Sequence, residues 1–335
     1  MTPPRTPGAG GTSGGIPPAP SPASAARRRP RARLRADCTA DSAGGLTFDV
    51  ALRDGSAGDR WDAALLLERR GPGGDGPPYG DGDPYDHGDG PADPFAPGEV
   101  TDAADHWVRL PLFPSGDDRL RAALPSTMTL AEGRWDAYVA LGDEPPRRLL
   151  PGALELRPLG DRDPSAHRTW LGVRIPYASR NGGLAVRAWL RWPHAELADL
   201  SVADGGLRLR GRLFGAALDD GARVEAWPRG GAGERVTAGV RGAGGPDFTA
   251  TLCLDTLLAA VPRSGGEDRA GPAVRDVWLR PAEGAAPVRV GRILDDVPDK
   301  KRACPHPPHR TADGTATPYY TRDNDLAVRL ERPPV

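Results

Sequence analysis

The stretch WLGVRIPYASRNGGLAVRAWLRW, residues 170–192, contains two runs in which apolar residues alternate with polar or charged residues. Alternation with a period of two is typical of antiparallel strands that turn one face toward a core and one toward water. The runs flank RNGG at 180–183, and Asn-Gly favours the positive φ angles of a tight hairpin turn. The stretch therefore predicts a β-hairpin with a charged face in solvent.

The middle of this stretch occurs twice in the chain. PYASRNGGLAVR at 176–187 returns as PYYTRDNDLAVR at 318–329, where Asn324 suits a left-handed backbone position. We infer that one β-rich unit is used twice, because three further blocks match in the same order. They are GGL at 44–46 with GGL at 205–207, RLRAALPSTMTL at 119–130 with DFTATLCLDTLL at 247–258, and WDAYVAL at 135–141 with RDVWLRP at 275–281.

Other strands show the same alternation, for example LTFDVALR at 46–53 and GGLRLRGRL at 205–213. The 44 glycines and 38 prolines disfavour long helices. The sequence therefore predicts an all-β protein with two tandem immunoglobulin-like antiparallel β-sandwiches, β-hairpin connectors and a disordered N-terminal tail. The predicted boundaries are 1–33 for the tail, 34–160 for sandwich one with an acidic Gly/Pro loop at 71–105, 161–194 for a hairpin connector, 195–297 for sandwich two, and 298–335 for a Pro-rich segment and a C-terminal hairpin.

Composition narrows the expected partners and compartment. The chain has 44 basic and 45 acidic residues, a formal net charge of −1, which offers no general attraction to nucleic acid or to an anionic membrane. No apolar stretch is long enough for a membrane span, and the N-terminus lacks the apolar core of a secretory signal. The three widely spaced cysteines indicate no disulfide framework. We therefore expect no nucleic-acid partner, no membrane span and a cytoplasmic location.

An acidic segment at 74–99 carries the first candidate metal site. Asp81-Gly82-Asp83 has the DxD form with which nucleotide-sugar transferases hold a divalent metal, and Asp86 adds a further carboxylate. Glycine and proline surround this motif, so a solvated acidic loop is the favoured interpretation. Weak Ca²⁺ binding, which needs six to eight oxygen ligands, and a catalytic DxD are the alternatives.

A second candidate metal site lies near the C-terminus. Cys304, His306 and His309 are residue types that bind zinc, and they lie within six residues. Only three ligands are close in sequence, and the interleaved prolines favour a stiff extended connector. We expect no cofactor, with Ca²⁺ at the acidic loop and Zn²⁺ at 304–309 as the weaker alternatives.

Aromatic residues are the candidates for ligand binding. The chain has eight tryptophans, and an exposed indole can stack on the C–H face of a sugar ring, although tryptophan more often fills a core. Trp189 is the first candidate for an exposed indole, because it shares a strand face with Arg187 and Arg191. The repeated hairpins offer a second candidate surface, for which packing is the favoured alternative. It consists of Tyr177, Arg180, Tyr319 and Arg322.

No set of residues suited to catalysis is recognisable. The sequence has no G-x-S-x-G elbow, no P-loop and no G-x-G-x-x-G after a strand. The paired carboxylates at 219–220 and 295–296 fall in turn-like sequence, where solvated acids are usual. We therefore predict no catalytic residue.

The order of DFTATLCLDTLL, RDVWLRP and PYYTRDNDLAVR resembles the accessory β domains of bacterial cell-wall polymer transferases. These are teichoic-acid-type glycosyltransferases and CDP-glycerol glycerophosphotransferases. The resemblance implies a non-catalytic module for cell-wall glycopolymer synthesis that binds carbohydrate or a partner transferase; the chain has nothing like the catalytic domains of those enzymes. The alternatives are a transferase with a site between the sandwiches, and a scaffold without a ligand. The matching residues are Phe248, Ala250 and Leu252, then Trp135-Asp136 with Tyr138, then Pro176-Tyr177 with Leu184.

Overall fold

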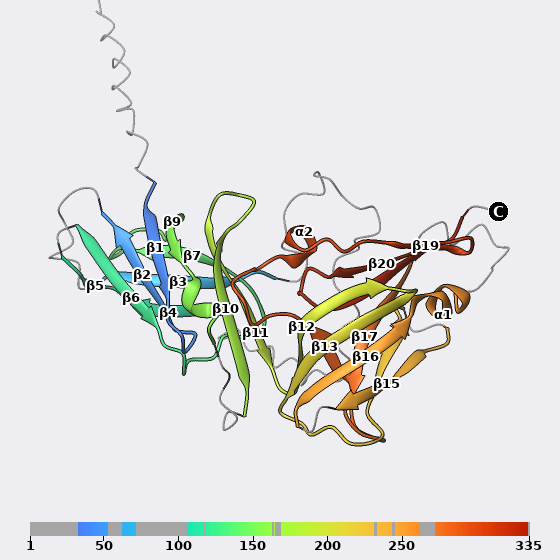
Figure 1. Ribbon diagram of the computed structural model, residues 1–335. Helices are drawn as coiled ribbons and strands as arrows, with labels where there is room; N and C mark the ends of the chain where they lie inside the picture. The colour runs from blue at the N-terminus through green and yellow to red at the C-terminus, as the bar shows by residue number, and fades with distance from the viewer. Residues whose placement is uncertain are drawn as a thin grey trace, which may run out of the picture. The chain divides into compact units, whose positions relative to one another are not determined.

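β-Strands make up most of the computed structural model, which describes residues 33–52, 62–71, 106–116, 118–162, 164, 169–230, 233–242, 245–261 and 272–333 (Figure 1). The all-β prediction is confirmed. The strands of the N-terminal half are β1 (Arg35–Ala40), β2 (Leu46–Ala51), β3 (Ala64–Arg69), β4 (Trp107–Pro111), β5 (Phe113–Pro114), β6 (Arg119–Leu124), β7 (Gly133–Ala140), β8 (Arg147–Arg148), β9 (Leu150–Glu155), β10 (Leu171–Ala178) and β11 (Leu184–Arg191).

The C-terminal half continues with β12 (His194–Ala203), β13 (Gly206–Phe214), β14 (Arg223–Pro228), β15 (Val236–Gly242), β16 (Asp247–Cys253), β17 (Ala273–Arg280), β18 (Val288–Gly291), β19 (His309–Thr311), β20 (Gly314–Tyr320) and β21 (Leu326–Glu331). Short helices are η3 (Arg157–Leu159), α1 (Leu254–Ala259) and α2 (Lys300–Ala303). None of the helices in the described part of the chain is long and apolar enough to cross a membrane.

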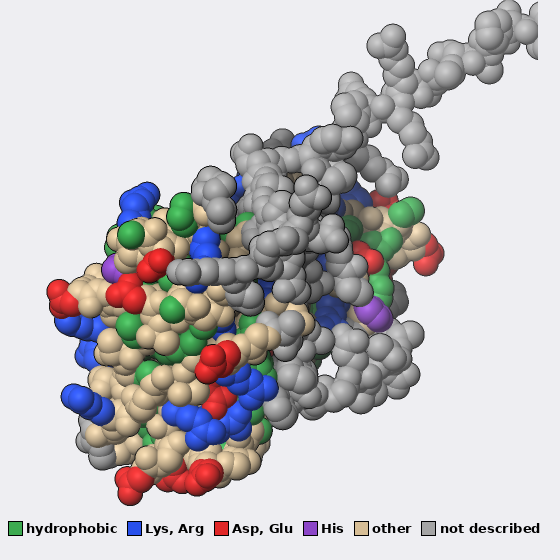
Figure 2. Space-filling model, turned by 90° about the vertical axis from the view of Figure 1, so that its right-hand side faces the viewer, with side chains coloured by type: hydrophobic (Ala, Val, Ile, Leu, Met, Phe, Trp, Pro, Cys, Tyr) green, Lys and Arg blue, Asp and Glu red, His purple; other side chains and the backbone are tan. Residues whose placement is uncertain are grey.

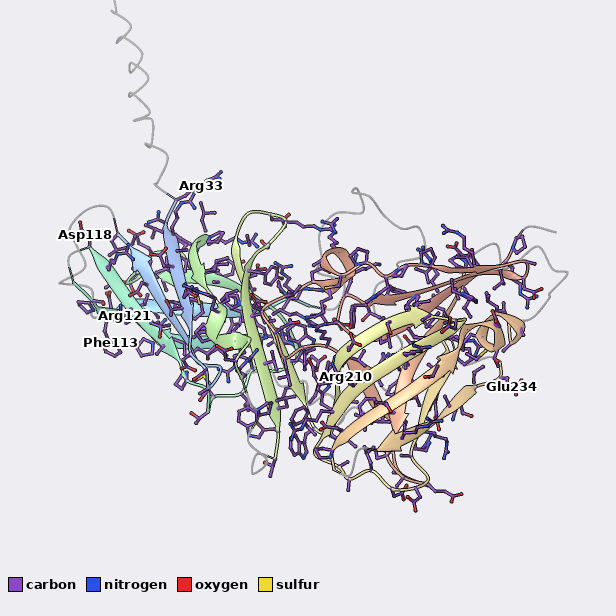
Figure 3. The ribbon with its side chains drawn as sticks, viewed as in Figure 1. Arg33, Phe113, Asp118, Arg121, Arg210 and Glu234 are labelled. Atoms are coloured by element: carbon purple, nitrogen blue, oxygen red, sulfur yellow. The ribbon has the colours of Figure 1, made fainter. Side chains whose placement is uncertain are left out.

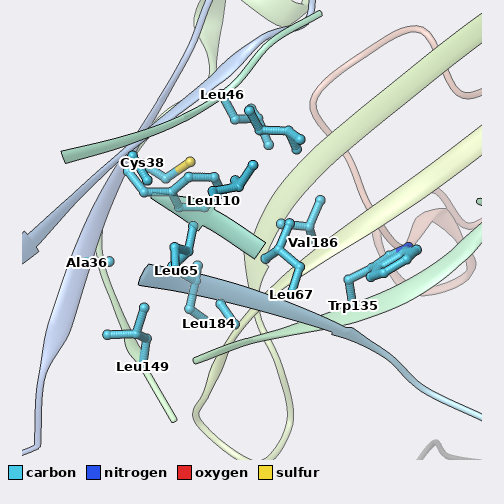
Figure 4. Packing of buried hydrophobic residues seen from close by; sticks show 14 of the residues in the cluster. Ala36, Cys38, Leu46, Leu65, Leu67, Leu110, Trp135, Leu149, Leu184 and Val186 are labelled. Carbon is cyan, nitrogen blue, oxygen red and sulfur yellow. The ribbon is translucent and has the colours of Figure 1, made fainter. Parts of the chain in front are cut away.

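The described strands of the N-terminal half form two sheets that enclose one core. One sheet has the order β5-β6-β2-β1-β9 and the other the order β10-β11-β7-β3-β4, with β8 paired to β7. Strand β6 shows why the sheets face each other, since every second side chain, beginning with Leu120, is buried and its neighbours are exposed. Cys38, Leu65, Leu67, Trp135 and Val186 come together in this core from strands of both sheets (Figure 4).

The described strands of the C-terminal half form one continuous sheet. Its order is β14-β15-β16-β13-β12-β18-β17-β21-β20-β19, and a further pairing of β14 with β17 closes it on itself. Separate sheets were predicted here, and that prediction is wrong for this half. The side chains directed into the closed sheet form a second core, which includes Leu209, Phe248 and Val277.

Strand continuity explains why only one half closes. β15 pairs with β14 through Val236–Gly239 and with β16 through Val240–Gly242, so a single strand spans the corner. In the N-terminal half the corresponding segment is divided into β4, which pairs with β3, and β5, which pairs with β6. β18 likewise pairs with both β17 and β12, whereas β8 and β9 divide these roles between them.

Residues that match in sequence also hold matching positions in the sheets. Leu46 of β2 lies opposite Leu124 of β6, and Leu207 of β13 lies opposite Leu252 of β16. A second set surrounds two aspartates. Asp136 of β7 lies between Glu68 and Ala185, and Asp276 of β17 lies between Trp227 and Ala327.

Both predicted hairpins are confirmed. β10 pairs with β11 around a turn with Gly182 at φ +71°, and β20 pairs with β21 around a turn with Asn324 at φ +60°. They are not separate connecting segments, however, because β11 pairs with β7 and β21 pairs with β17. Nearly all of the predicted tail at 1–33 and of the predicted acidic loop at 71–105 lies outside the described residues, which include only residues 33 and 71 of these segments.

Candidate functional site

Strand β11 carries the first predicted site residue, Trp189, which is 1% exposed. Its Nε1 donates a hydrogen bond to the carbonyl oxygen of Asp323 at 2.9 Å, and the Arg187 guanidinium lies 4.7 Å from the centroid of its ring. The candidate exposed indole is therefore buried. The charged face of β11, predicted to be in solvent, is covered by the turn of the second hairpin.

Ion pairs hold that turn against β11. Arg191 contacts Asp325 at 2.5 Å and Glu132 at 2.7 Å, and Arg187 contacts Asp323. Burial disfavours the charged form of Arg191, but the charges of Asp325 and Glu132 outweigh it and hold the pKa of Arg191 well above its ordinary value. We call this set of contacts the hairpin seam. Its contacts between β11 and the second hairpin join residues more than 130 positions apart in sequence. The seam therefore has a structural role.

The other hairpin residues occupy unlike environments. Tyr177 is half-buried and Arg180 lies exposed in the first turn. Arg322, its counterpart in the second turn, accepts a hydrogen bond at its carbonyl oxygen from Arg134 at 3.2 Å. Tyr319 is half-buried, and the centroid of its ring lies 5.9 Å from Lys301 Nζ. The two turns thus differ in surroundings although Arg180 and Arg322 hold corresponding positions in them.

The zinc candidates have separate partners. His309 Nε2 lies 2.8 Å from the Asp255 carboxylate, and the His306 ring packs on Tyr320 with 5.5 Å between ring centroids. Burial and the charge of Arg292 lower the pKa of His306. Across the described ranges no group of three or more His, Cys, Asp or Glu residues is placed to hold a metal, so Cys304, His306 and His309 do not form a site. Asp81, Asp83 and Asp86 lie outside the described residues.

Two carboxylates on the outward face of the sheets were not singled out by the sequence. Asp136 accepts two hydrogen bonds from Arg70, at 2.8 and 2.9 Å, and one from Arg148 at 2.6 Å. Burial disfavours its charged form, but the two arginines prevail and lower its pKa. The sequence signal for these two residues was the alignment of Asp136 with Asp276 in the matching blocks. Asp276 likewise accepts a hydrogen bond from an arginine, Arg229, at 2.6 Å.

Beside Asp136, the outward face of β4, β3 and β7 presents an exposed indole. Trp107 is 45% exposed, and its ring centroid lies 6.1 Å from that of Tyr138, with the planes tilted by 48°. Burial, and then the carboxylates of Glu68 and Asp136, raise the pKa of Tyr138, whose hydroxyl hydrogen-bonds Glu68. Glu68 lies opposite Trp107 in the sheet, and exposed Arg109 lies next but one to Trp107 along β4. We call Glu68, Trp107, Arg109 and Tyr138 the aromatic shelf.

The corresponding place on β14, β15 and β17 is closed by aromatic and cationic side chains. The Trp227 ring packs on Trp278 with 5.1 Å between centroids. Arg235 lies 3.8 Å above the Trp227 ring, and Arg289 lies 4.5 Å from the Trp278 ring. Trp278 is 2% exposed. We call these four residues the closed stack.

Elsewhere the surface mixes charges and apolar groups. Figure 3 labels Phe113, which is 64% exposed, and Arg121, which pairs with Asp49 at 2.8 Å. On the face shown in Figure 2, basic, acidic and apolar side chains are interspersed among the described residues. This distribution resembles an ordinary solvated surface more than a field of one charge sign.

Comparison with known proteins gives no family assignment. No protein-family model matches the chain, and no curated protein matches it. Two solved structures of TarS from S. aureus are similar at low level. The fragment 217–571 has 12% identity over 66% of this chain and 56% of its own length, with a TM-score of 0.25. The other has 10% identity over 66% of this chain and 35% of its own length, with a TM-score of 0.26. The chain thus spans only part of either structure.

Proposed function

We propose that the chain is a non-catalytic β module that binds carbohydrate through the aromatic shelf, in association with bacterial cell-wall glycopolymer synthesis. In this proposal one unit is used twice, as β1–β11 and β12–β21. The matched registers around Leu46 and Leu207 support the duplication. The link to cell-wall polymers, or to a transferase that makes them, rests on the resemblance of the strand motifs.

The single observation that carries the binding function is the exposed indole of Trp107 beside Tyr138. A large aromatic ring left in water on a rigid sheet offers an apolar platform for the C–H face of a sugar ring. Glu68 and Arg109 lie on the same face and supply an acceptor and a donor for hydroxyl groups. Few polar groups around an apolar surface are typical of small-molecule recognition.

The state of the ion-paired carboxylates in the two halves supports a binding role over catalysis. A general acid or base works best with a pKa near the operating pH. Arg70 and Arg148 lower the pKa of Asp136, and hydrogen bonds from Arg280 and Trp227, acting against burial, lower that of Glu225. Both groups are therefore fixed negative charges at neutral pH.

Binding and turnover measurements on the purified chain test this proposal together. Titration with teichoic-acid-type glycopolymers and with methyl pyranosides is expected to show binding that Trp107→Ala weakens at least tenfold. Phe113→Ala is the matched control, because Phe113 is also an exposed aromatic but lies on the other sheet; it is expected to bind as the parent protein does. Turnover of CDP-glycerol or a nucleotide sugar by the chain alone would refute the non-catalytic assignment.

A further inference from the structure

We propose that only the aromatic shelf of the N-terminal half binds a sugar ring, because the closed stack fills the equivalent place in the C-terminal half with the chain's own side chains. This inference rests on the proposed function and deepens it. Of these two places in the described part of the chain, it assigns a ligand to one and names the ligand's class as a neutral, hydroxylated ring.

The equivalence of the two places follows from the strand registers. Glu68 lies opposite Asp136, and Trp227 lies opposite Asp276. Two residues beyond each of them an arginine, Arg70 or Arg229, binds the aspartate through two hydrogen bonds. Each arginine also donates its backbone N–H to a matching carbonyl, Arg134 for Arg70 and Val274 for Arg229.

The remaining members of the two sets correspond in the same way. Tyr138 lies opposite Arg148, and Trp278 lies opposite Arg289. Trp107 is the partner of Glu68 on the neighbouring strand, and Arg235, next to Val236, holds the corresponding place beside Trp227. The shelf and the stack are therefore two versions of one position in the unit.

The side chains at that position differ in one decisive respect. In the shelf a carboxylate, Glu68, accepts the hydrogen bond of the Tyr138 hydroxyl and leaves the Trp107 ring in water. In the stack an indole, Trp227, takes the place of the carboxylate and contacts both the Trp278 ring and the Arg235 guanidinium. The indole of Trp227 thus occupies the place that corresponds to the sugar site of the shelf.

A buried polar atom without a hydrogen-bond partner accompanies this difference between Glu68 and Trp227. Nε1 of Trp278 is buried and finds no acceptor among the described residues. Buried donors are nearly always hydrogen-bonded, so each exception requires an explanation. Here the explanation is that the residue equivalent to the acceptor Glu68 is Trp227, which has no acceptor atom.

The charges on the shelf indicate the class of ligand. The two charged side chains of the shelf, Glu68 and Arg109, carry opposite charges, and Asp136 behind them is paired with Arg70 and Arg148. A shelf with one charge of each sign gives no strong preference to a polyanion or a polycation. It suits a ring with an apolar face for Trp107 and hydroxyl groups for the two charged side chains.

Stoichiometry and matched substitutions test the inference. Isothermal titration with methyl β-glucoside, methyl β-galactoside and methyl N-acetyl-β-glucosaminide is expected to give one site per chain. Trp107→Ala is expected to weaken binding at least tenfold, and Trp227→Ala less than twofold. Grafting the shelf into the second place by Trp227→Glu together with Arg235→Trp is expected to raise the stoichiometry toward two.

The outcomes separate this inference from the function on which it rests. If the parent protein binds none of the pyranosides and no glycopolymer, the proposed function fails and the inference fails with it. If the parent binds two ligands per chain, or if Trp227→Ala weakens binding as much as Trp107→Ala, carbohydrate binding stands and the division between the two places is refuted.

Discussion

The hairpin seam yields the sharpest prediction about stability. In the parent protein the Arg191 and Asp325 side chains are 12% and 6% exposed and lie 2.5 Å apart. Asp325→Asn removes one charge and leaves the guanidinium of Arg191 with Glu132 alone, whose side chain is 35% exposed. Breaking a buried ion pair by removing one partner costs about 3–5 kcal/mol. Because Glu132 remains, we expect the lower figure, about 3 kcal/mol.

This loss is large enough to measure by calorimetry. For a chain of this length about 2 °C of melting temperature corresponds to 1 kcal/mol, so Asp325→Asn is expected to melt about 6 °C lower at neutral pH. Because the seam joins β11 to the second hairpin, the single transition is also expected to broaden or divide. Asp204→Asn is the control, since the Arg208–Asp204 pair is 56% and 86% exposed and exposed pairs contribute little.

A double-mutant cycle decides whether the pair itself is responsible. Arg191→Met combined with Asp325→Asn leaves no uncompensated charge between the two positions, so the double variant is expected to be more stable than the sum of the single losses predicts. Strictly additive losses, or a control that melts as low as Asp325→Asn, would show that the seam is not held by this ion pair.

Three further predictions concern pH, backbone conformation and thiol reactivity. The folded-state pKa of Asp136 lies below its ordinary value of 3.8, so the stability that Asp136 gives the fold is complete above about pH 5 and is lost as pH falls through the folded value. The difference in melting temperature between the parent protein and Asp136→Asn is therefore expected to shrink from pH 5 to pH 2.5. Asn324→Ala is expected to lower the free energy of unfolding in urea by about 2–3 kcal/mol, because φ at Asn324 is +60° and its side chain accepts a hydrogen bond from the Lys300 backbone N–H at 3.0 Å. Asn324→Gly relieves only the backbone strain, so equal losses for both variants would contradict this account. Cys253 is exposed and its pKa is lowered by hydrogen bonding to Thr256, whereas burial raises the pKa of Cys38. A thiol reagent is therefore expected to label Cys253 in the native protein and Cys38 only after unfolding, which peptide mapping would detect.

Much of the local structure is readable from the sequence. Period-two alternation located the strands, Asn-Gly located the first turn, and Asn324 was correctly expected in a left-handed position. The aligned blocks also hold matching places in the sheets, as the pairs Leu46 with Leu124 and Leu207 with Leu252 show. These features depend on neighbours along the chain or directly across one hairpin or sheet.

The environment of each strand face was decided by tertiary structure. Alternation shows which residues share a face, but not what covers that face. Trp189 was the candidate for exposure and is buried under the second hairpin, while Trp107 was not singled out and is exposed. The sequence carried a signal for this difference. When the two hairpin segments are aligned, Leu171, Val173 and Ile175 correspond to Asp313, Thr315 and Thr317, so the first hairpin has a second apolar face that the other hairpin lacks.

The sequence by itself therefore determined the all-β class and the two hairpins, because hydrogen-bonded pairing and turn geometry follow from local pattern. Only the tertiary structure decided that the second sheet closes and that the acids of RDND pair with Arg187 and Arg191. Sheet closure depends on whether one strand spans a corner without interruption, and a buried ion pair depends on two segments meeting from distant parts of the chain.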